Sequence, residues 1–259
     1  MSFAAGISSQ ARVVEALILR ETRTRFGKHQ IGYLWAVIEP TLLVLTFYAV
    51  FALTNRQPPE GTYIIGFLAT GMIPYQVFRS CVDRSATAIS ANKALLYYPQ
   101  IRPLELIVAR ATLELATLTS VFFILMIADS LIAGRFAVDS ILWVLIGLGL
   151  AGALGGALGM LVCAGTVFSS SVENLPGIVL RPMFWISGIF FSVGALPSEA
   201  RNIVLWNPVL HLVELVRSAW YPAYGDRYVD LGYVSGWILA LAFAGLTLER
   251  VARRRLELT

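Results

Sequence analysis

The sequence predicts an all-α integral membrane protein with six transmembrane helices, and three observations lead to this prediction. The chain of 259 residues is 57% hydrophobic with a mean hydropathy of +0.71, and only 14% of its residues are charged, whereas soluble domains carry roughly a quarter. Several apolar runs reach the ~20 residues that a helix needs to cross a hydrocarbon core of ~30 Å. In addition, the stretch Arg20–Phe51 places cations before aromatic residues and a long apolar segment, the order of a chain that enters a membrane from the cytoplasm.

The first predicted element is an amphipathic helix over residues 9–28. Four apolar residues recur at helical spacing and share one face: Ala11, Val14, Leu17 and Ile18. Because the sequence shows no other partner for this face, we expect the helix to lie in the membrane interface with its cations toward the lipid headgroups. The alternative is a solvated extension of the first span.

The six spans are expected over residues 34–53, 62–78, 104–133, 141–168, 175–193 and 231–248. The third span carries Arg110 and Glu114, whose four-residue spacing lets them pair on one helix face. The fifth span contains Arg181 in its interior. A guanidinium at that depth must face protein, water or substrate rather than lipid.

The fourth span is rich in glycine. Gly152 and Gly156, and likewise Gly155 and Gly159, form pairs of small residues four apart, which let helix backbones approach closely in membranes. We expect these pairs to pack within the chain. A contact between subunits is the alternative.

Two segments are too polar or too short to span. Residues 86–97 predict a short cytoplasmic helix that Pro99 and Pro103 close, and such a helix is suited to docking a soluble partner, although a plain loop is the alternative. Residues 197–221 contain short apolar runs divided by prolines. We expect two short helices there that re-enter the outer leaflet, with Trp206, Trp220 and Tyr221 at the depth of the headgroups.

The distribution of Lys and Arg favours an orientation with both termini in the cytoplasm. In a topology with six spans, twelve of these cations lie in cytoplasmic segments: Arg12, Arg20, Arg23, Arg25, Lys28, Arg84, Lys93, Arg102, Arg250, Arg253, Arg254 and Arg255. Five fall outside: Arg56, Arg135, Arg201, Arg217 and Arg227. Cytoplasmic loops of membrane proteins carry the excess of such cations.

Several kinds of chemistry have no motif in this sequence. It contains no GxxxxGK[ST] phosphate-binding loop, no HExxH and no GxSxG, so it predicts no ATP site of its own, no metal site and no enzyme of covalent chemistry. Cys81 and Cys163 are expected to be buried free thiols. These absences favour a permease. An ion-coupled carrier and a membrane-embedded glycosyl- or acyltransferase are the alternatives. The sequence shows neither the cluster of intramembrane carboxylates that such a carrier would need nor the cluster of acid, base and nucleophile that such a transferase would need.

Three motifs resemble a known family. They are RETRTRFGKHQIGYLWAVIEP at residues 20–40, NKALLYYPQIRPLE at residues 92–105 and LWNPVLHLVELVR at residues 205–217. Together they resemble the permease subunit of the ABC transporters that export capsular polysaccharide from Gram-negative bacteria. The resemblance extends over essentially the whole chain in length, span count and order of motifs.

This resemblance implies a homodimer in the inner membrane, bound to two copies of a separate cytoplasmic ATPase. ATP and Mg would bind to that ATPase, and the permease would bind no cofactor. The implied cargo is an acidic polysaccharide with a lipid at one end, and the implied partners farther out are a periplasmic adaptor resembling co-polymerases and an outer-membrane export protein. Nucleic acid has no role. Permeases for O-antigen, teichoic acid or drugs are the nearest alternatives.

The resemblance also gives candidate site residues. The segment 86–97 becomes the coupling helix that fits the ATPase, with Asn92, Lys93, Leu95 and Leu96 at the contact. The re-entrant element becomes an outer gate that includes Trp206, Asn207, Pro208, His211 and Glu214.

A substrate path is the remaining hypothesis. We expect the path to be lined or guarded by three arginines and two aromatic residues: Arg79, Arg84, Arg181, Tyr98 and Trp185. Arginine stays charged under all relevant conditions and suits an acidic polymer, while aromatic faces suit sugar rings. The alternative for each arginine is an internal ion pair, as between Arg79 and Asp83 at four-residue spacing.

Overall fold

The computed structural model describes residues 3–26, 31–59, 61–98, 101–134 and 138–256. Every regular element in these ranges is a helix: α1 (Phe3–Phe26), α2 (Ile31–Leu53), α3 (Ile64–Ala86), α4 (Ala88–Ala91), the 3₁₀ helix η1 (Lys93–Tyr97), α5 (Pro103–Ala133), α6 (Ile141–Thr166), η2 (Ser170–Asn174), α7 (Leu175–Trp185), η3 (Val193–Ala195), α8 (Ser198–Val204), α9 (Pro208–Trp220) and α10 (Leu231–Leu256). The predicted all-α class is therefore confirmed.

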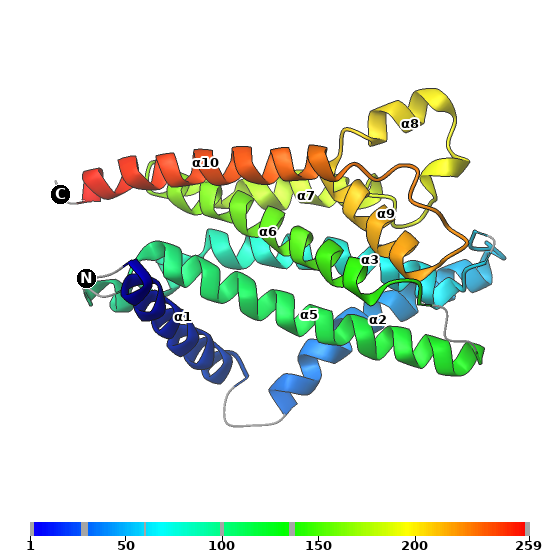
Figure 1. The fold of residues 1–259 in the computed structure, drawn as a ribbon, viewed down its shortest axis with the longest axis horizontal. Helices are drawn as coiled ribbons and strands as arrows, with labels where there is room; N and C mark the ends of the chain where they lie inside the picture. Colours follow the sequence, from blue (N-terminus) through cyan, green and yellow to red (C-terminus); the bar gives the residue numbers. More distant parts are fainter. Residues whose placement is uncertain (1–2, 27–30, 60, 99–100, 135–137, 257–259) are drawn as a thin grey trace.

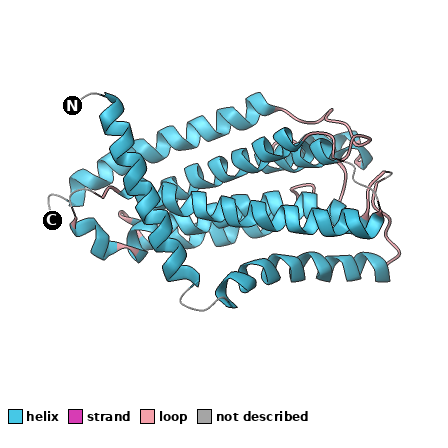
Figure 2. Ribbon diagram, turned by 60° about the horizontal axis from the view of Figure 1, so that its bottom comes forward, coloured by secondary structure: helices cyan, strands magenta, loops and turns pink. Residues whose placement is uncertain are grey.

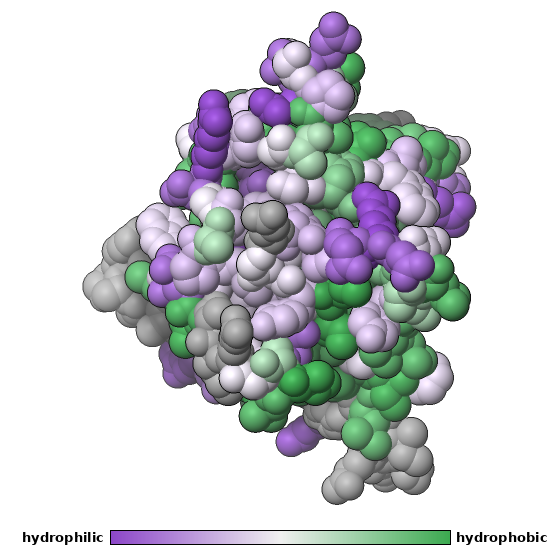
Figure 3. Space-filling model, turned by 90° about the vertical axis from the view of Figure 1, so that its right-hand side faces the viewer, coloured by the Kyte–Doolittle hydropathy of each residue, from purple (hydrophilic) through white to green (hydrophobic). Residues whose placement is uncertain are grey.

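The long helices lie side by side along the long axis of the molecule (Figure 1). Helix α3 packs against α2, α5, α6 and α9, and α10 packs mainly against α6. Helix α1 crosses the bundle obliquely at the end where both termini lie (Figures 1 and 2), whereas α8 and α9 lie at the opposite end. Hydrophilic and intermediate side chains occupy much of that opposite end (Figure 3), as expected where a bundle meets water.

Within the described part of the chain, four helices are long and apolar enough to cross a membrane: α2, α5, α6 and α10. Their outward faces carry exposed large apolar side chains such as Leu42, Ile124, Leu142 and Phe243, which suit contact with lipid. Helix α3 is as long as α2. However, it lies inside the bundle and continues to Ala86, eight residues beyond the predicted second span. The count of six spans stays a prediction.

The structure differs most from the predicted fifth span over residues 175–193. Helix α7 ends at Trp185, and its 11 residues cover about 17 Å, roughly half of a hydrocarbon core. The chain then turns through Gly188 at φ +73°, a conformation that favours glycine. The carbonyls that follow bond to arginine side chains instead of helix amides, since Arg217 donates to Gly188 and Arg56 donates to Phe190.

The paired glycines of α6 (Gly152, Gly155, Gly156 and Gly159) pack within the chain. A Cβ atom at Gly155 would lie 2.3 Å from the Phe78 carbonyl oxygen, and one at Gly159 would lie 2.7 Å from the Val82 carbonyl oxygen. This pair therefore sets the close approach of α6 to α3. Gly156 instead faces α5, where a Cβ atom would lie 3.6 Å from the Cβ of Ala111, an ordinary contact.

A methyl group at Gly155 is expected to force α6 and α3 apart. Gly155→Ala should lower the free energy of unfolding by about 1–3 kcal/mol, the usual cost of overpacking. Gly156→Ala is the matched control and should change it little. Thermal unfolding of the purified protein in detergent measures both, and equal stability of the two variants would contradict this account of the α3–α6 contact.

Helix α1 has a protein partner that the sequence did not reveal. Leu17 is only 7% exposed and belongs to a cluster with Leu106 and Ile107 of α5 and Ala88 of α4. The expectation that only lipid would cover the apolar face is thus corrected, because the partners follow about 70 to 90 positions later in the chain. Interfacial placement of the exposed face stays a prediction, and residues 27–28 of the predicted helix lie outside the described residues.

The predicted helix over residues 86–97 is divided in the structure. Ala86 is the last residue of α3, and Asn92 separates α4 from η1. The side-chain amide of Asn92 donates to the Ala88 carbonyl at 3.1 Å, and the backbone N–H of Asn92 donates to the Ile89 carbonyl. These local bonds end the α-helical turn at this residue.

Candidate functional site

A groove of about 600 Å³ opens between α2, α3 and α7. Its lining includes polar and aromatic side chains from all three helices: Trp35, Glu39, Thr46, Tyr75, Gln76, Arg79, Ser80, Asp83 and Phe184. Polar and ionisable groups are rare at membrane depth and usually face the interior of the bundle or a substrate pathway. This groove is therefore the candidate substrate path.

Aromatic rings continue from the groove toward the end of α7. Trp185 packs with Phe184 and Phe190, with ring centroids 5.6 and 5.2 Å away. Phe184 in turn lies 5.2 Å from Tyr75, whose hydroxyl donates to the Leu180 carbonyl and fixes α7 on α3. The structure thus places the predicted path residue Trp185 in an aromatic cluster that borders the groove.

The groove itself is not cationic. Arg79 Nε lies 3.6 Å from Asp83 Oδ2, so the pairing offered as the alternative reading of Arg79 is confirmed. With Glu39, the described lining holds two carboxylates and one guanidinium. Arg181 differs, because it is exposed on α7 and has no ion-pair partner among the described residues. It shares a helix face with Trp185, four positions later, and is the predicted arginine best able to meet an anionic cargo.

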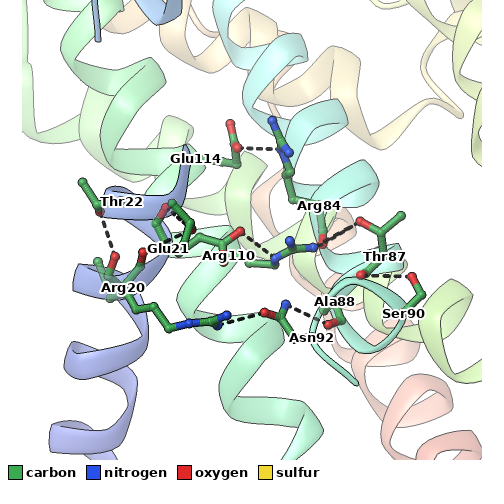
Figure 4. A network of polar contacts seen from close by, with 12 residues as sticks. Arg20, Glu21, Thr22, Arg84, Thr87, Ala88, Ser90, Asn92, Arg110 and Glu114 are labelled. Atoms are coloured by element: carbon green, nitrogen blue, oxygen red, sulfur yellow. Dashed lines mark hydrogen bonds and ion pairs between the residues drawn. The ribbon is translucent and has the colours of Figure 1, made fainter. Parts of the chain in front are cut away.

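Four charged residues gather where the C-terminal end of α3 meets α1 and the N-terminal part of α5, and we call Glu21, Arg84, Arg110 and Glu114 the polar cluster (Figure 4). Arg110 Nε lies 2.9 Å from Glu21 Oε1, and Arg84 Nε lies 3.0 Å from Glu114 Oε1. The pairs join α1 to α5 and α3 to α5. The four-residue spacing lets Arg110 and Glu114 pair with each other, and in the structure each has an ion-pair partner on another helix. Arg84, a predicted path residue, belongs to this cluster.

The residues predicted to contact an ATPase divide into exposed and internal side chains. Lys93 is exposed, Leu95 is half-buried against the apolar cluster of Leu17, and Asn92 is buried with 5% exposure. The side chain of Leu96 lies outside the described residues. Tyr98, a predicted path residue, follows η1 with 62% exposure, at the end of the molecule where η1 and both termini lie. It is therefore better placed for a partner than for the groove.

At the opposite end, Arg217 of α9 is fully buried. Its guanidinium donates to the carbonyls of Gly188, Phe67 and Ile189 at 3.0, 3.3 and 3.4 Å. It also lies 4.0 Å from the ring centroid of Phe67, within the range of a cation–π contact. Arg217 therefore connects α9 to α3 and to the turn after α7.

A carboxylate and a phenol complete this site. Glu214 Oε1 lies 3.4 Å from Arg217 and accepts a 2.8 Å hydrogen bond from the Tyr224 hydroxyl. Burial raises the pKa of Tyr224, although the nearby Arg217 opposes this shift. The phenol thus keeps its proton at neutral pH and acts as the donor to Glu214.

The other predicted gate residues mostly fix α9 in place. Asn207 Oδ1 accepts from the Val209 amide at the start of α9, and its Nδ2 donates to Ser187 at 2.8 Å. His211 is buried, with its ring nitrogens 2.9 Å from the carbonyls of Tyr228 and Leu205. Pro208 begins the helix, where its missing N–H is tolerated. Trp206 alone of this predicted set is strongly exposed, at 77%.

Sequence reasoning missed the role of Arg217, which it counted among the outside cations. The available signal was the three-residue spacing from Glu214 within an apolar helix, since a charge surrounded by apolar residues needs a partner. No three His, Cys, Asp or Glu side chains gather into a metal site in the described ranges.

Comparison with known proteins decides the family. The model of the ABC-2 type transporter family matches residues 12–221. The chain belongs to this family. The ABC-2 chain is the membrane-embedded permease component of a transporter and not its ATPase, and the family resemblance inferred from the three motifs is confirmed.

Several relatives match this chain over nearly their whole length. It is 36% identical to the polysialic acid transport protein KpsM of Escherichia coli over 95% of each chain. It is 29% identical to the capsule polysaccharide export inner-membrane protein BexB of Haemophilus influenzae, over 99% of this chain and 97% of BexB. It is also 29% identical to the inner-membrane protein CtrC of Neisseria meningitidis serogroup A, over 95% of this chain and 92% of CtrC. The ABC-2 chain is a multi-pass inner-membrane protein.

Proposed function

We propose that this permease exports a lipid-linked acidic capsular polysaccharide across the inner membrane to the periplasm. The observation that carries the proposal is the match, over at least 92% of each protein, to relatives whose names specify polysialic acid transport or capsule polysaccharide export. Three such proteins from three species agree in the class of cargo. The cargo of this chain is inferred from them.

The groove between α2, α3 and α7 has chemistry that suits this cargo. Trp35 and Phe184 offer aromatic faces, on which sugar rings stack without a fixed hydrogen-bond register. Contacts of that kind allow a polymer to slide. Arg181, on the adjacent helix face, supplies the cation for acidic groups.

An ABC permease works with a partner ATPase, and we place that partner at the end of the bundle that carries α4 and η1. In this arrangement two permease copies form the membrane part and two ATPase copies bind ATP and Mg. The exposed Lys93 and Tyr98 face the ATPase. Both chain ends lie on the same side (Figure 1), in keeping with a cytoplasmic location for both termini.

The α8–α9 end then faces the periplasm and forms the outer gate. Arg217 holds α9 against α3 and is paired with Glu214, and Trp206 stands exposed at the corner between α8 and α9. In the proposed pathway this end passes the polymer to a periplasmic adaptor and then to an outer-membrane export protein.

Co-purification tests the ATPase partnership. The tagged permease, extracted from its native membrane in mild detergent, is expected to bring down a stoichiometric ATPase whose activity is measurable in the eluate. Mass spectrometry identifies the partner. A folded permease that repeatedly elutes without any ATPase would contradict the proposed mechanism and favour an ion-coupled carrier.

A further inference from the structure

The last turns of α1 are bonded to the junction between α4 and η1. Arg20 donates from its guanidinium to Asn92 Oδ1 at 3.0 Å, and Asn92 Nδ2 donates to the Ala88 carbonyl at 3.1 Å (Figure 4). Asn92 is buried and stands between the two short helices. A single amide therefore joins the guanidinium of α1 to the backbone of α4.

A second link reaches the other end of α4. Glu21, the neighbour of Arg20, accepts a 2.9 Å bond from Arg110 of α5. Arg110 also donates to the Arg84 carbonyl at 3.1 Å and to the Thr87 hydroxyl at 3.2 Å, and Thr87 lies between α3 and α4. Helix α4 is thus held at both ends by side chains that α1 engages, and η1 follows directly after the second of these links.

Apolar packing joins the same elements. Leu17 of α1 lies in one buried cluster with Ala88 of α4, and Val14 and Leu95 pack against that cluster. A change in the position of α1 therefore acts on α4–η1 through side-chain packing as well as through the two polar links.

The same C-terminal end of α1 leads toward the candidate substrate path. Four residues separate it from α2, which supplies Trp35 and Glu39 to the groove. Only 17% of the apolar span of α2 is buried, against 44% for α6. Helix α2 is therefore weakly held by the rest of the chain and is free to respond to what occupies the groove.

We propose that α1 is a lever that couples occupancy of the groove to the ATPase-docking segment, with Arg20, Glu21 and Arg110 as its positioning residues. The inference rests on the proposed function, because it requires an ATPase on α4–η1. Cargo in the groove shifts α2, α1 follows, and the two links carry the shift to α4–η1. Cargo can change the ATPase only through such a differential contact between two states.

The first test compares two arginines on α1. Arg20→Ala removes the bond to Asn92, whereas Arg23→Ala removes a cation that is exposed on the same helix. Permease–ATPase complexes are reconstituted in proteoliposomes, and ATP hydrolysis is measured with and without the glycolipid-terminated polysaccharide extracted from the source bacterium. Arg20→Ala is expected to reduce stimulation by cargo about five- to tenfold, the scale of one lost intramolecular hydrogen bond, with basal hydrolysis and bound ATPase unchanged. Arg23→Ala should keep the stimulation.

The second test separates positioning from folding. Glu21→Arg and Arg110→Glu each place like charges together and should lose the stimulation by cargo, whereas the double exchange restores the ion pair and should recover it. Bound ATPase and the melting temperature of the permease are measured on every variant. Equal stimulation in Arg20→Ala, Arg23→Ala and the wild type would overturn the lever. Loss of stimulation only together with loss of bound ATPase would also overturn it and assign these residues to docking.

The lever and the proposed function fail in distinguishable ways. If the wild-type permease binds no ATPase, the proposed function is wrong and the lever with it. If the wild-type complex exports polysaccharide and responds to cargo while Arg20→Ala, Glu21→Arg and Arg110→Glu respond like the wild type, only the lever is wrong.

Discussion

Arg217→Leu is expected to lower the free energy of unfolding by about 3–5 kcal/mol, the cost of removing one partner from a buried charge pair. The guanidinium donates to the carbonyls of Gly188, Phe67 and Ile189. These carbonyls belong to the turn after α7 or to the first turn of α3, and buried backbone carbonyls of this kind need a hydrogen-bond donor. Glu214 would lose its cation and keep its hydrogen bonds from the Tyr224 hydroxyl and the Val193 backbone.

The experiment compares three variants in detergent by thermal unfolding and by limited proteolysis of the α7–α9 region. Arg227→Leu is the control, because Arg227 is an exposed arginine near the ring of Tyr228, and it should change stability by less than ~0.5 kcal/mol. Arg217→Lys keeps the charge but not the planar fork, so an intermediate loss is expected. A stable Arg217→Leu variant would show that the buried guanidinium does not hold the outer end together.

Arg181→Gln is expected to abolish export while leaving binding of the ATPase intact. Arg181 is exposed on α7 without an ion-pair partner among the described residues, so its charge is available to an acidic polymer. Arg79 is already paired with Asp83. Arg79→Gln should therefore reduce export less.

Surface polysaccharide is measured in cells that carry each variant as the sole copy, together with the amount of ATPase that co-purifies. Arg181→Lys is the control, because it retains a cation and should retain part of the export. Normal surface polysaccharide with Arg181→Gln would contradict a role in the substrate path. Loss of export together with loss of the ATPase would point to misfolding instead.

Local composition was enough to predict the most apolar helices. The spans expected over 34–53, 104–133 and 141–168 correspond to α2, α5 and α6, with bounds that differ by at most three residues. These segments have a high mean hydropathy, so the local chain determines the helix. The family also followed from local motifs, which the comparison confirmed.

Features that depend on distant partners could not be predicted. The end of α7 is set by Arg217 and Arg56, which lie 29 and 134 positions from the carbonyls that they bond. Likewise, Arg110 had a carboxylate at helical spacing, yet it pairs with Glu21, 89 positions away. The sequence offered two carboxylates of equal chemistry, and only the placement of α1 decides between them.

Asn92 shows the same limit at the candidate site. Its position in a predicted docking helix suggested contact with a partner, whereas its side chain turns inward to Arg20 and Ala88. The local sequence around a polar residue in a short helix is the same whether its side chain contacts a partner protein or packs inside its own chain. Its burial results from α1, which packs across the segment from far earlier in the chain.

The most direct test of the proposed function is to delete the gene in the source bacterium and to quantify capsular polysaccharide at the surface and inside the cells. Export by this permease predicts that surface polysaccharide is lost and that lipid-linked polymer accumulates inside, with both reversed by the wild-type gene. Unchanged surface capsule, or loss of O-antigen or another polymer in its place, would contradict the assignment of the cargo.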